Sequence, residues 1–550
     1  MHHRREPGRA KSAFLSGVVI LTVSNLLTKM AGLLFKIPMN YIVGDTGMGY
    51  YNSAYSIYTF FYMLATSGLP VALSVTVSEN RAAGNVTGAK TVYRAALALF
   101  TAGGLLTACV MLFASGSLAD LIRSDKSALS VMIAAPTMLF ICVSSAVRGY
   151  FQGCGNMVPT AVSQLIEAVG KLVIGIAAAM YAIRMGYEIH VIAAYAVSGL
   201  TLGSLAGMIY LLIARFIRRD RDLMPDDDLL RNQKQPIGGI LRRFVRISLP
   251  VTISASVMSL TNMIDTAMIQ RVLQNSGMSG ETAAALYGNY TSLAVPMFNL
   301  PPVLVYPIAY SLVPAVAAAF ASGKIGEARE KIQTSFRFAV IIGLPCAMGL
   351  TTLADPILCL LYKPESAHMA SPLLTMLAPS SFFVCILAVT NSILQSCGEE
   401  RKPVISMLAG AAVKFISGRI LLETMGISGA PISTFLCYLT VTVLNFAFVV
   451  RVSGIRLELN RIFLRPLLSS SLCTLTASAV YRMLAPRIGG KIGCMGAILA
   501  AAGVYLGCLI LTKSVEREEI SRLLGSRLTG RLFKRKDVQN IERKNLQFEK

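Results

Sequence analysis

The chain has 550 residues, of which 54% are hydrophobic and only 14% charged, and its mean hydropathy is +0.61. Soluble domains carry roughly 25% charged residues, so this composition excludes a string of soluble domains and indicates a polytopic membrane protein. Lysine and arginine number 51 against 28 acidic residues, which gives a formal net charge of +23. The position of these cations decides between nucleic-acid binding and membrane topology.

Apolar stretches of about 20 residues, enough to cross a bilayer, recur from Phe14 to Thr512. We expect an all-α fold of about fourteen membrane-spanning helices, because only helices and closed barrels satisfy backbone groups in lipid and barrel alternation is absent. The first stretch is too long for a signal peptide and is kept as a span. The predicted spans are 13–38, 50–77, 92–114, 128–149, 158–180, 190–214, 247–270, 288–320, 336–361, 371–395, 404–423, 428–450, 464–483 and 492–512.

The cations follow this topology. With the N-terminus placed in the cytoplasm, the cytoplasmic segments hold 38 Lys and Arg, the outer segments 8 and the spans 5. Cytoplasmic loops of membrane proteins carry such an excess. We therefore predict that both termini are cytoplasmic and that the basic charge reflects topology, with no nucleic-acid partner.

The chain also repeats itself. Leu118-Ala119-Asp120 reappears as Leu353-Ala354-Asp355, and Gln152-Gly153-Cys154-Gly155 reappears as Gln395-Ser396-Cys397-Gly398, at offsets of 235 and 243 residues. Each repeat holds six spans, so the halves are parallel, as in transporters with two bundles around a shared cavity. The predicted divisions are a cytoplasmic N-terminus (1–12), an N-lobe (13–214), a cytoplasmic linker (215–246), a C-lobe (247–450), two further spans (451–512) and a basic cytoplasmic tail (513–550).

Motifs for catalysis, nucleotides and metals are missing from the sequence. GxxxxGK[ST], HExxH and GxSxG do not occur. The eleven cysteines are scattered singly, and the four histidines form no constellation with metal-ligand spacing. We expect a protein that is not an enzyme, with no cofactor, no metal site and no catalytic residue.

Polar residues inside the spans are the candidate functional groups, because a charge at the bilayer centre is costly. Asn25, Lys29 and Lys36 follow one another at helical spacing in the first span. We predict that Lys29 is an anion ligand and that Lys36 either assists it or extends to the membrane surface.

Two spans at equivalent places in the repeats carry a lysine each. Glu167 and Lys171 are spaced i, i+4, which predicts either mutual neutralisation or a role in ion coupling or pairing at the cavity. Lys414 has no acid within four residues on its own helix, so we expect it to face a wet cavity. Asp265, with Asn262 beside it, is predicted either to bind a coupling cation or to pair with a cavity lysine.

Aromatic residues and helix breakers mark two further spans. The second span carries an aromatic stripe, which predicts either packing and interfacial anchoring or a platform for sugars. It consists of Tyr51, Tyr55, Tyr58 and Tyr62. Glycine and proline then predict broken, moving helices in the second and eighth spans. The predicted hinges are Gly68, Pro70, Pro301 and Pro307.

Three segments resemble the stage V sporulation protein B family: Thr28-Lys29-Met30-Ala31-Gly32, Ser67-Gly68-Leu69-Pro70-Val71-Ala72-Leu73-Ser74 and Val147-Arg148-Gly149-Tyr150-Phe151-Gln152-Gly153. The resemblance implies a MurJ-related flippase of the superfamily that includes MATE transporters, with two pseudo-symmetric six-helix bundles plus two C-terminal helices. It further implies transport of an undecaprenyl-diphosphate-linked saccharide such as lipid II. Lys29 and Lys36 stand where relatives usually have arginines.

From these features we expect a flippase in the bacterial plasma membrane that moves a lipid-linked oligosaccharide to the outer leaflet by alternating access. Its partners are that substrate and membrane lipids, with a coupling cation left open. Lys29, Lys36, Lys414 and Asn25 are the predicted diphosphate ligands. The alternatives are a cation-coupled drug antiporter, for which Asp265 is the best evidence, and a non-transporting scaffold for envelope enzymes.

Overall fold

The computed structural model describes residues 7–218, 237–454, 458 and 460–512, and these residues form helices and no strand. The first half contains α1 (Pro7–Thr66), α2 (Leu69–Ala82), α3 (Val86–Phe113), α4 (Ser115–Leu121), η1 (Asp125–Ser127), α5 (Ala128–Gly153), α6 (Val158–Arg184) and α7 (Ile189–Arg218). The second half contains α8 (Ile237–Asn275), α9 (Gly280–Asn289), η2 (Tyr290–Ala294), α10 (Val295–Phe298), α11 (Leu300–Ala321), α12 (Ile325–Thr352), α13 (Ala354–Leu361), α14 (Pro364–Ser396), α15 (Arg401–Met425), η3 (Gly426–Ser428) and α16 (Gly429–Ser453). It is followed by η4 (Asn460–Leu464), α17 (Arg465–Ile488) and α18 (Gly490–Leu511).

Some predicted divisions fall outside this description. The tail 513–550, residues 1–6 of the predicted N-terminus and residues 219–236 of the predicted linker lie beyond the described residues. Helices α7 and α8 take up the two ends of the predicted linker. The divisions themselves stay predictions.

The all-α membrane fold is confirmed. Eleven helical stretches among the described residues are long and apolar enough to cross a membrane. Two of them, Leu27–Ala82 and Arg401–Ser453, contain 56 and 53 residues. One crossing needs about 20 residues, so each of the two is long enough for more than one crossing. The count of fourteen remains a prediction.

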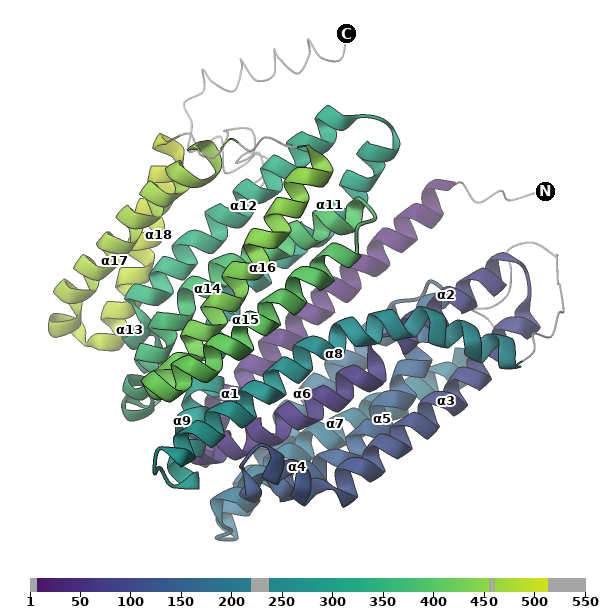
Figure 1. The fold of residues 1–550 in the computed structure, drawn as a ribbon, viewed down its shortest axis with the longest axis horizontal. Helices are drawn as coiled ribbons and strands as arrows, with labels where there is room; N and C mark the ends of the chain where they lie inside the picture. Colours follow the sequence, from purple (N-terminus) through teal and green to yellow (C-terminus); the bar gives the residue numbers. More distant parts are fainter. Residues whose placement is uncertain (1–6, 219–236, 455–457, 459, 513–550) are drawn as a thin grey trace.

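The helices gather into two lobes, with α1 lying between them (Figure 1). Helices α1 to α7 pack on one another as the N-lobe, and α9 to α16 pack as the C-lobe. Helix α8 belongs to the second half but packs on α1, α2 and α3 as well as on α15, so it bridges the lobes. The pair α17 and α18 packs on α12 and α13 at the margin of the C-lobe.

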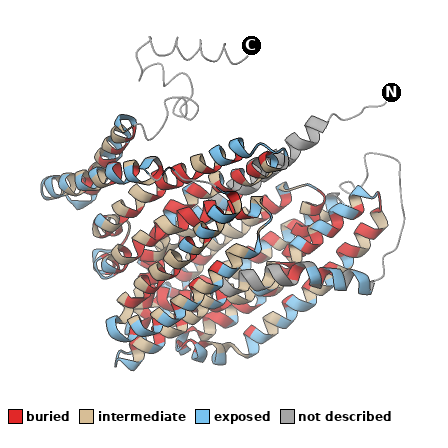
Figure 2. Cartoon of the chain, turned by 45° about the horizontal axis from the view of Figure 1, so that its top comes forward, coloured by how far each residue is buried: buried red, intermediate tan, exposed pale blue. Residues whose placement is uncertain are grey.

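Burial follows this arrangement. Buried residues run through the inner helices of both lobes, while large parts of the marginal helices are exposed (Figure 2). Many exposed side chains on α18 are large and apolar, including Leu499 and Leu506. A water-exposed apolar surface of this kind is unfavourable, so these faces of α18 are suited to lipid.

At one end of the molecule the lobes are closed against each other. We call this the distal end; it holds α4, α9 and α13 (Figure 1). Gly49 of α1 packs against the Ala284 carbonyl of α9, and Gly288 of α9 packs against the Asp45 carbonyl of α1. A side chain at either glycine would overlap the opposing backbone, so the close crossing depends on both glycines.

Polar contacts reinforce the distal closure. The Ser366 hydroxyl of α14 donates a hydrogen bond of 2.8 Å to the Asp45 carboxylate, and the Asn52 amide donates one of 2.5 Å to the Ser292 hydroxyl. The carboxylate of Asp45 lies beside Gly44, whose φ of +68° kinks α1 at this point. The distal end is therefore held by bonds between two separate lobes.

Candidate functional site: the central cavity

A cavity of about 330 Å³ lies between the two lobes. The N-lobe contributes α1, and the second half contributes helices from α8 to α16. The cavity brings together five of the predicted site residues: Lys36, Tyr55, Asn262, Asp265 and Lys414. Among the described residues, two lysines and a single aspartate supply its charged groups.

Lys36 reaches the cavity from α1 and meets the broken eighth span. Its ammonium donates a hydrogen bond of 2.7 Å to the carbonyl oxygen of Thr291. Thr291 lies in the π-helical turn η2 (Tyr290–Ala294), five residues before Pro296. Because proline has no N–H, the carbonyls four and five residues before it lack their usual helical donor. Lys36 fills this gap at Thr291, and the Tyr362 hydroxyl donates to the neighbouring Ser292 carbonyl at 3.2 Å.

Lys414 lines the cavity from α15 and is paired. Its ammonium forms an ion pair with the carboxylate of Asp265, on α8. The Lys414 and Asp265 side chains are 10% and 19% exposed, so water screens the pair weakly. The acid that pairs with Lys414 comes from a different helix, so the spacing along α15 could not show it. Asp265 takes one of its two predicted roles, pairing with a cavity lysine.

The predicted pair between Glu167 and Lys171 does not form. Glu167 instead accepts a hydrogen bond of 2.6 Å from the guanidinium of Arg148, on α5. The Lys171 ammonium lies 4.5 Å from the centre of the Tyr55 ring and also lies over the rings of Phe35 and Tyr51. Glu167 therefore binds a guanidinium, a planar group with several donors, while Lys171 lies among aromatic rings. The two residues have different partners although they share one helix face.

The aromatic stripe is continuous but mostly internal. Its rings follow one another at centroid distances of 5.5 to 6.0 Å. Tyr51 and Tyr58 are buried in the core of the N-lobe, and Tyr62 packs against that core. Tyr55 alone of the four lines the cavity, so a direct contact with a ligand in this cavity falls to Tyr55.

Lys29 and Asn25 lie on α1 before Lys36, and both are exposed. The Lys29 ammonium lies 4.4 Å from the ring centre of Tyr306, on α11 of the C-lobe. Lys29 therefore faces the other lobe, outside the lining of the central cavity. Its role as a diphosphate ligand stays a prediction, as does that of Asn25.

The predicted hinges coincide with breaks in the helices. Gly68 separates α1 from α2, and Pro70 follows in the first turn of α2. Pro301 lies in the first turn of α11, after a break at Asn299, and Pro307 lies within α11. The structure thus contains the breaks, while movement about them remains a prediction.

Two functional partners were missed by the sequence analysis. Arg148 was counted as a loop cation, although it is buried and neutralises Glu167. Thr291 carries no signal of its own, but Pro296 five residues later marks a carbonyl without its helical donor. The sequence therefore marks this carbonyl but does not show that Lys36 lies opposite it.

Together, these features define a multi-pass membrane protein with two helical lobes around a polar cavity, the architecture of a transporter. The chain belongs to the polysaccharide biosynthesis protein family, whose model matches residues 14–320. The MatE family model matches residues 250–419.

Individual relatives agree with this family. Stage V sporulation protein B of Bacillus subtilis is 26% identical over 94% of this chain and 98% of that protein. Lipid II flippase MurJ of the same organism is 23% identical over 94% of this chain and 98% of that protein. The solved structure titled "Lipid II flippase MurJ, inward closed conformation" has a TM-score of 0.68 at 13% identity, over 90% of this chain and 99% of that chain. At this identity, the similarity to the solved structure shows a shared fold and nothing more.

Proposed function

We propose that the protein is a flippase for a polyprenyl-diphosphate-linked saccharide, which it moves from the inner to the outer leaflet of the bacterial plasma membrane. The observation that carries this proposal is the Lys36 ammonium, which faces the cavity and is bound by a backbone carbonyl alone among the described residues. A cation without a counter-ion favours an anionic ligand. The relatives named for lipid II transport support the same substrate class.

Lys36 and Lys414 would hold the diphosphate from the two lobes. Lys414 forms an ion pair with Asp265, so a diphosphate would compete with this carboxylate for the ammonium. Lys29, beside Tyr306 on the same face of α1, would receive the headgroup on its way to Lys36. The saccharide would then occupy the cavity next to Tyr55, and the polyprenyl chain would stay in lipid.

Transport would require the distal end to open. With the termini in the cytoplasm, as the positive charges predict, the distal end faces outward. Release to the outer leaflet would then separate Gly49 from α9 and break the bond between Ser366 and Asp45. The helix breaks at Gly68 and Asn299 are the positions where the two lobes would bend.

The test is a complementation assay in bacteria depleted of their own flippases. It scores how much lipid-linked precursor a membrane-impermeant probe reaches at the outer leaflet. We expect Lys36→Glu and Lys29→Glu to abolish delivery, because each places a negative charge where the diphosphate would bind. Lys324→Glu is the matched control, since Lys324 is an exposed lysine away from the cavity. Normal delivery with Lys36→Glu would contradict the proposal.

A second candidate function is cation-coupled drug export. It is favoured by Asp265 in an aromatic cavity and by the MatE match over residues 250–419. This function predicts that Asp265→Asn abolishes export of cationic dyes by cells. A flippase without drug transport would leave dye export at the level of cells lacking the protein.

A further inference from the structure

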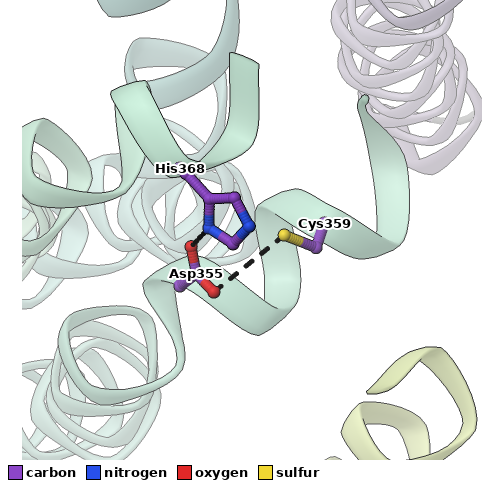
Figure 3. Close-up of side chains that lie close together, drawn as sticks. All are labelled: Asp355, Cys359 and His368. Atoms are coloured by element: carbon purple, nitrogen blue, oxygen red, sulfur yellow. Dashed lines mark hydrogen bonds and ion pairs between the residues drawn. The ribbon is translucent and has the colours of Figure 1, made fainter. Parts of the chain in front are cut away.

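Three different metal-ligating side chains meet at the distal end of the C-lobe, outside the central cavity (Figure 3). They are Asp355 and Cys359 of α13 and His368 of α14. The His368 Nδ1 atom lies 2.6 Å from the Asp355 Oδ1 atom, and the Cys359 Sγ atom lies 4.0 Å from Oδ2. All three ligand atoms lie within 4.8 Å of one another.

The local fold explains this convergence. Asp355 and Cys359 are four residues apart on a single turn of α13, so their side chains share one face. The chain turns at Tyr362 and Lys363, and α14 begins at Pro364. The turn brings the first part of α14 back alongside α13, which places His368 against that face. The sequence spacing shows no metal signature because the three side chains are divided between two helices.

We propose that Asp355, Cys359 and His368 bind a Zn²⁺-class divalent cation. Sulfur, imidazole nitrogen and carboxylate oxygen are the donors that zinc accepts, at bond lengths of about 2.0 to 2.3 Å. In a tetrahedral site two such donors lie about 3.3 to 3.7 Å apart, so side-chain rotations that move the ligand atoms by about 1 Å are needed. Three protein ligands leave a fourth position to water, and the mixed soft and hard donors disfavour Mg²⁺ and Ca²⁺.

The first repeat offers an internal comparison. At the offset of 235 residues, Asp355 corresponds to Asp120 and Cys359 corresponds to Ser124. Ser124 is buried and shares a hydrogen bond of 2.7 Å with Ser127. The first repeat therefore keeps the carboxylate but has a hydroxyl in place of the thiol. This makes the ligand set specific to the second repeat, and it supplies a matched control site.

A bound ion would also affect the contact between the lobes. His368 lies two residues after Ser366, whose hydroxyl bonds to Asp45 of the N-lobe. Helix α13, which supplies the other two ligands, packs against α18. The ion would fix the first turns of α14 against α13, and with them the position of Ser366. Metal occupancy would therefore stabilise the closed distal end.

The direct test uses the full-length chain, purified in detergent and treated with a chelator. Co²⁺ is titrated as a spectroscopic probe, and Zn²⁺ is then added to displace it. We expect one equivalent of Co²⁺ to give the visible bands of a tetrahedral site and a thiolate-to-metal charge-transfer band. His368→Gln and Cys359→Ser should weaken binding by more than about tenfold, since even outer-shell changes cost 10–100-fold.

Two control variants and a second readout complete the design. Asp120→Asn, at the equivalent place in the first repeat, and Cys397→Ser, a cysteine outside the cluster, should leave the cobalt spectrum unchanged. Peptide mapping after alkylation should show that Zn²⁺ protects Cys359 in the parent protein but not in His368→Gln. Thermal unfolding without metal checks that the variants are folded. Absence of the charge-transfer band, or an unchanged band in His368→Gln, would overturn the site and leave only the contact between His368 and Asp355.

Discussion

Lys171 of α6 and Lys414 of α15 occupy equivalent places in the two repeats, 243 residues apart, yet the protein accommodates them differently. Lys414 pairs with the carboxylate of Asp265, whereas Lys171 lies over three aromatic rings. The difference arises on the facing helices. Helix α8 supplies an acid to Lys414, while α1 supplies Phe35, Tyr51 and Tyr55 to Lys171.

This contrast shows that the two repeats keep a lysine at the same place but surround it with different side chains. The ion pair holds Lys414 with a partner that a ligand could replace. The aromatic box holds Lys171 without adding any negative charge, and Tyr55 is the box residue that lines the cavity. The duplicated scaffold thus surrounds two equivalent lysines with chemically different partners.

The largest expected effect comes from breaking the ion pair. Lys414→Met leaves the Asp265 carboxylate buried without its partner, which should cost about 3–5 kcal/mol of stability. The midpoint of thermal unfolding in detergent should fall accordingly. The double variant Lys414→Met/Asp265→Asn removes both charges and should recover most of the loss. A double variant as unstable as the single one would show that packing, and not the charge pair, sets the effect.

The second prediction concerns the distal glycines, where the two lobes meet. Gly49 of α1 and Gly288 of α9 pack reciprocally on each other's helices. Gly49→Ala and Gly288→Ala each force the helices apart and should cost about 1–3 kcal/mol. Similar losses are expected at both positions, unlike the unequal losses expected at the two lysines.

Gly103 on α3 is the control for the glycine pair, because an added side-chain carbon there meets no atom within 4 Å. Gly103→Ala should keep or raise the thermal midpoint, since alanine is the better helix former. If Gly49→Ala leaves the thermal midpoint as high as Gly103→Ala does, the two helices do not cross closely at Gly49.

The sequence alone predicts the features that depend on composition and order along the chain. These include the helical membrane fold, the repeat, the break before Pro301 and the cavity position of Lys414. It fails where two helices must be placed against each other. The Glu167 partner lies on α5, the Lys414 partner lies on α8, and the Cys359 and His368 ligands come from two helices. Helical spacing describes one helix face and holds no information about the helix opposite it.

The smallest effect is expected at Lys171. Lys171→Met removes a cation that is held by aromatic rings and should cost about 0.5–2 kcal/mol, well below the loss at Lys414. The measurement is a double-mutant cycle with Tyr55→Leu, read from unfolding in mixed micelles. Because the two side chains contact each other, the double variant should lose less than the sum of the single variants.

Tyr62→Leu provides the matched control for this cycle. Tyr62 belongs to the same stripe, but no contact with Lys171 is present among the described residues. Its effect should add to that of Lys171→Met within about 0.3–0.5 kcal/mol. Equal coupling to Tyr55 and Tyr62 would mean that the lysine stabilises the whole stripe electrostatically. A loss at Lys171 as large as that at Lys414 would mean that Lys171 is also neutralised by an acid, and the contrast between the two lysine environments would disappear.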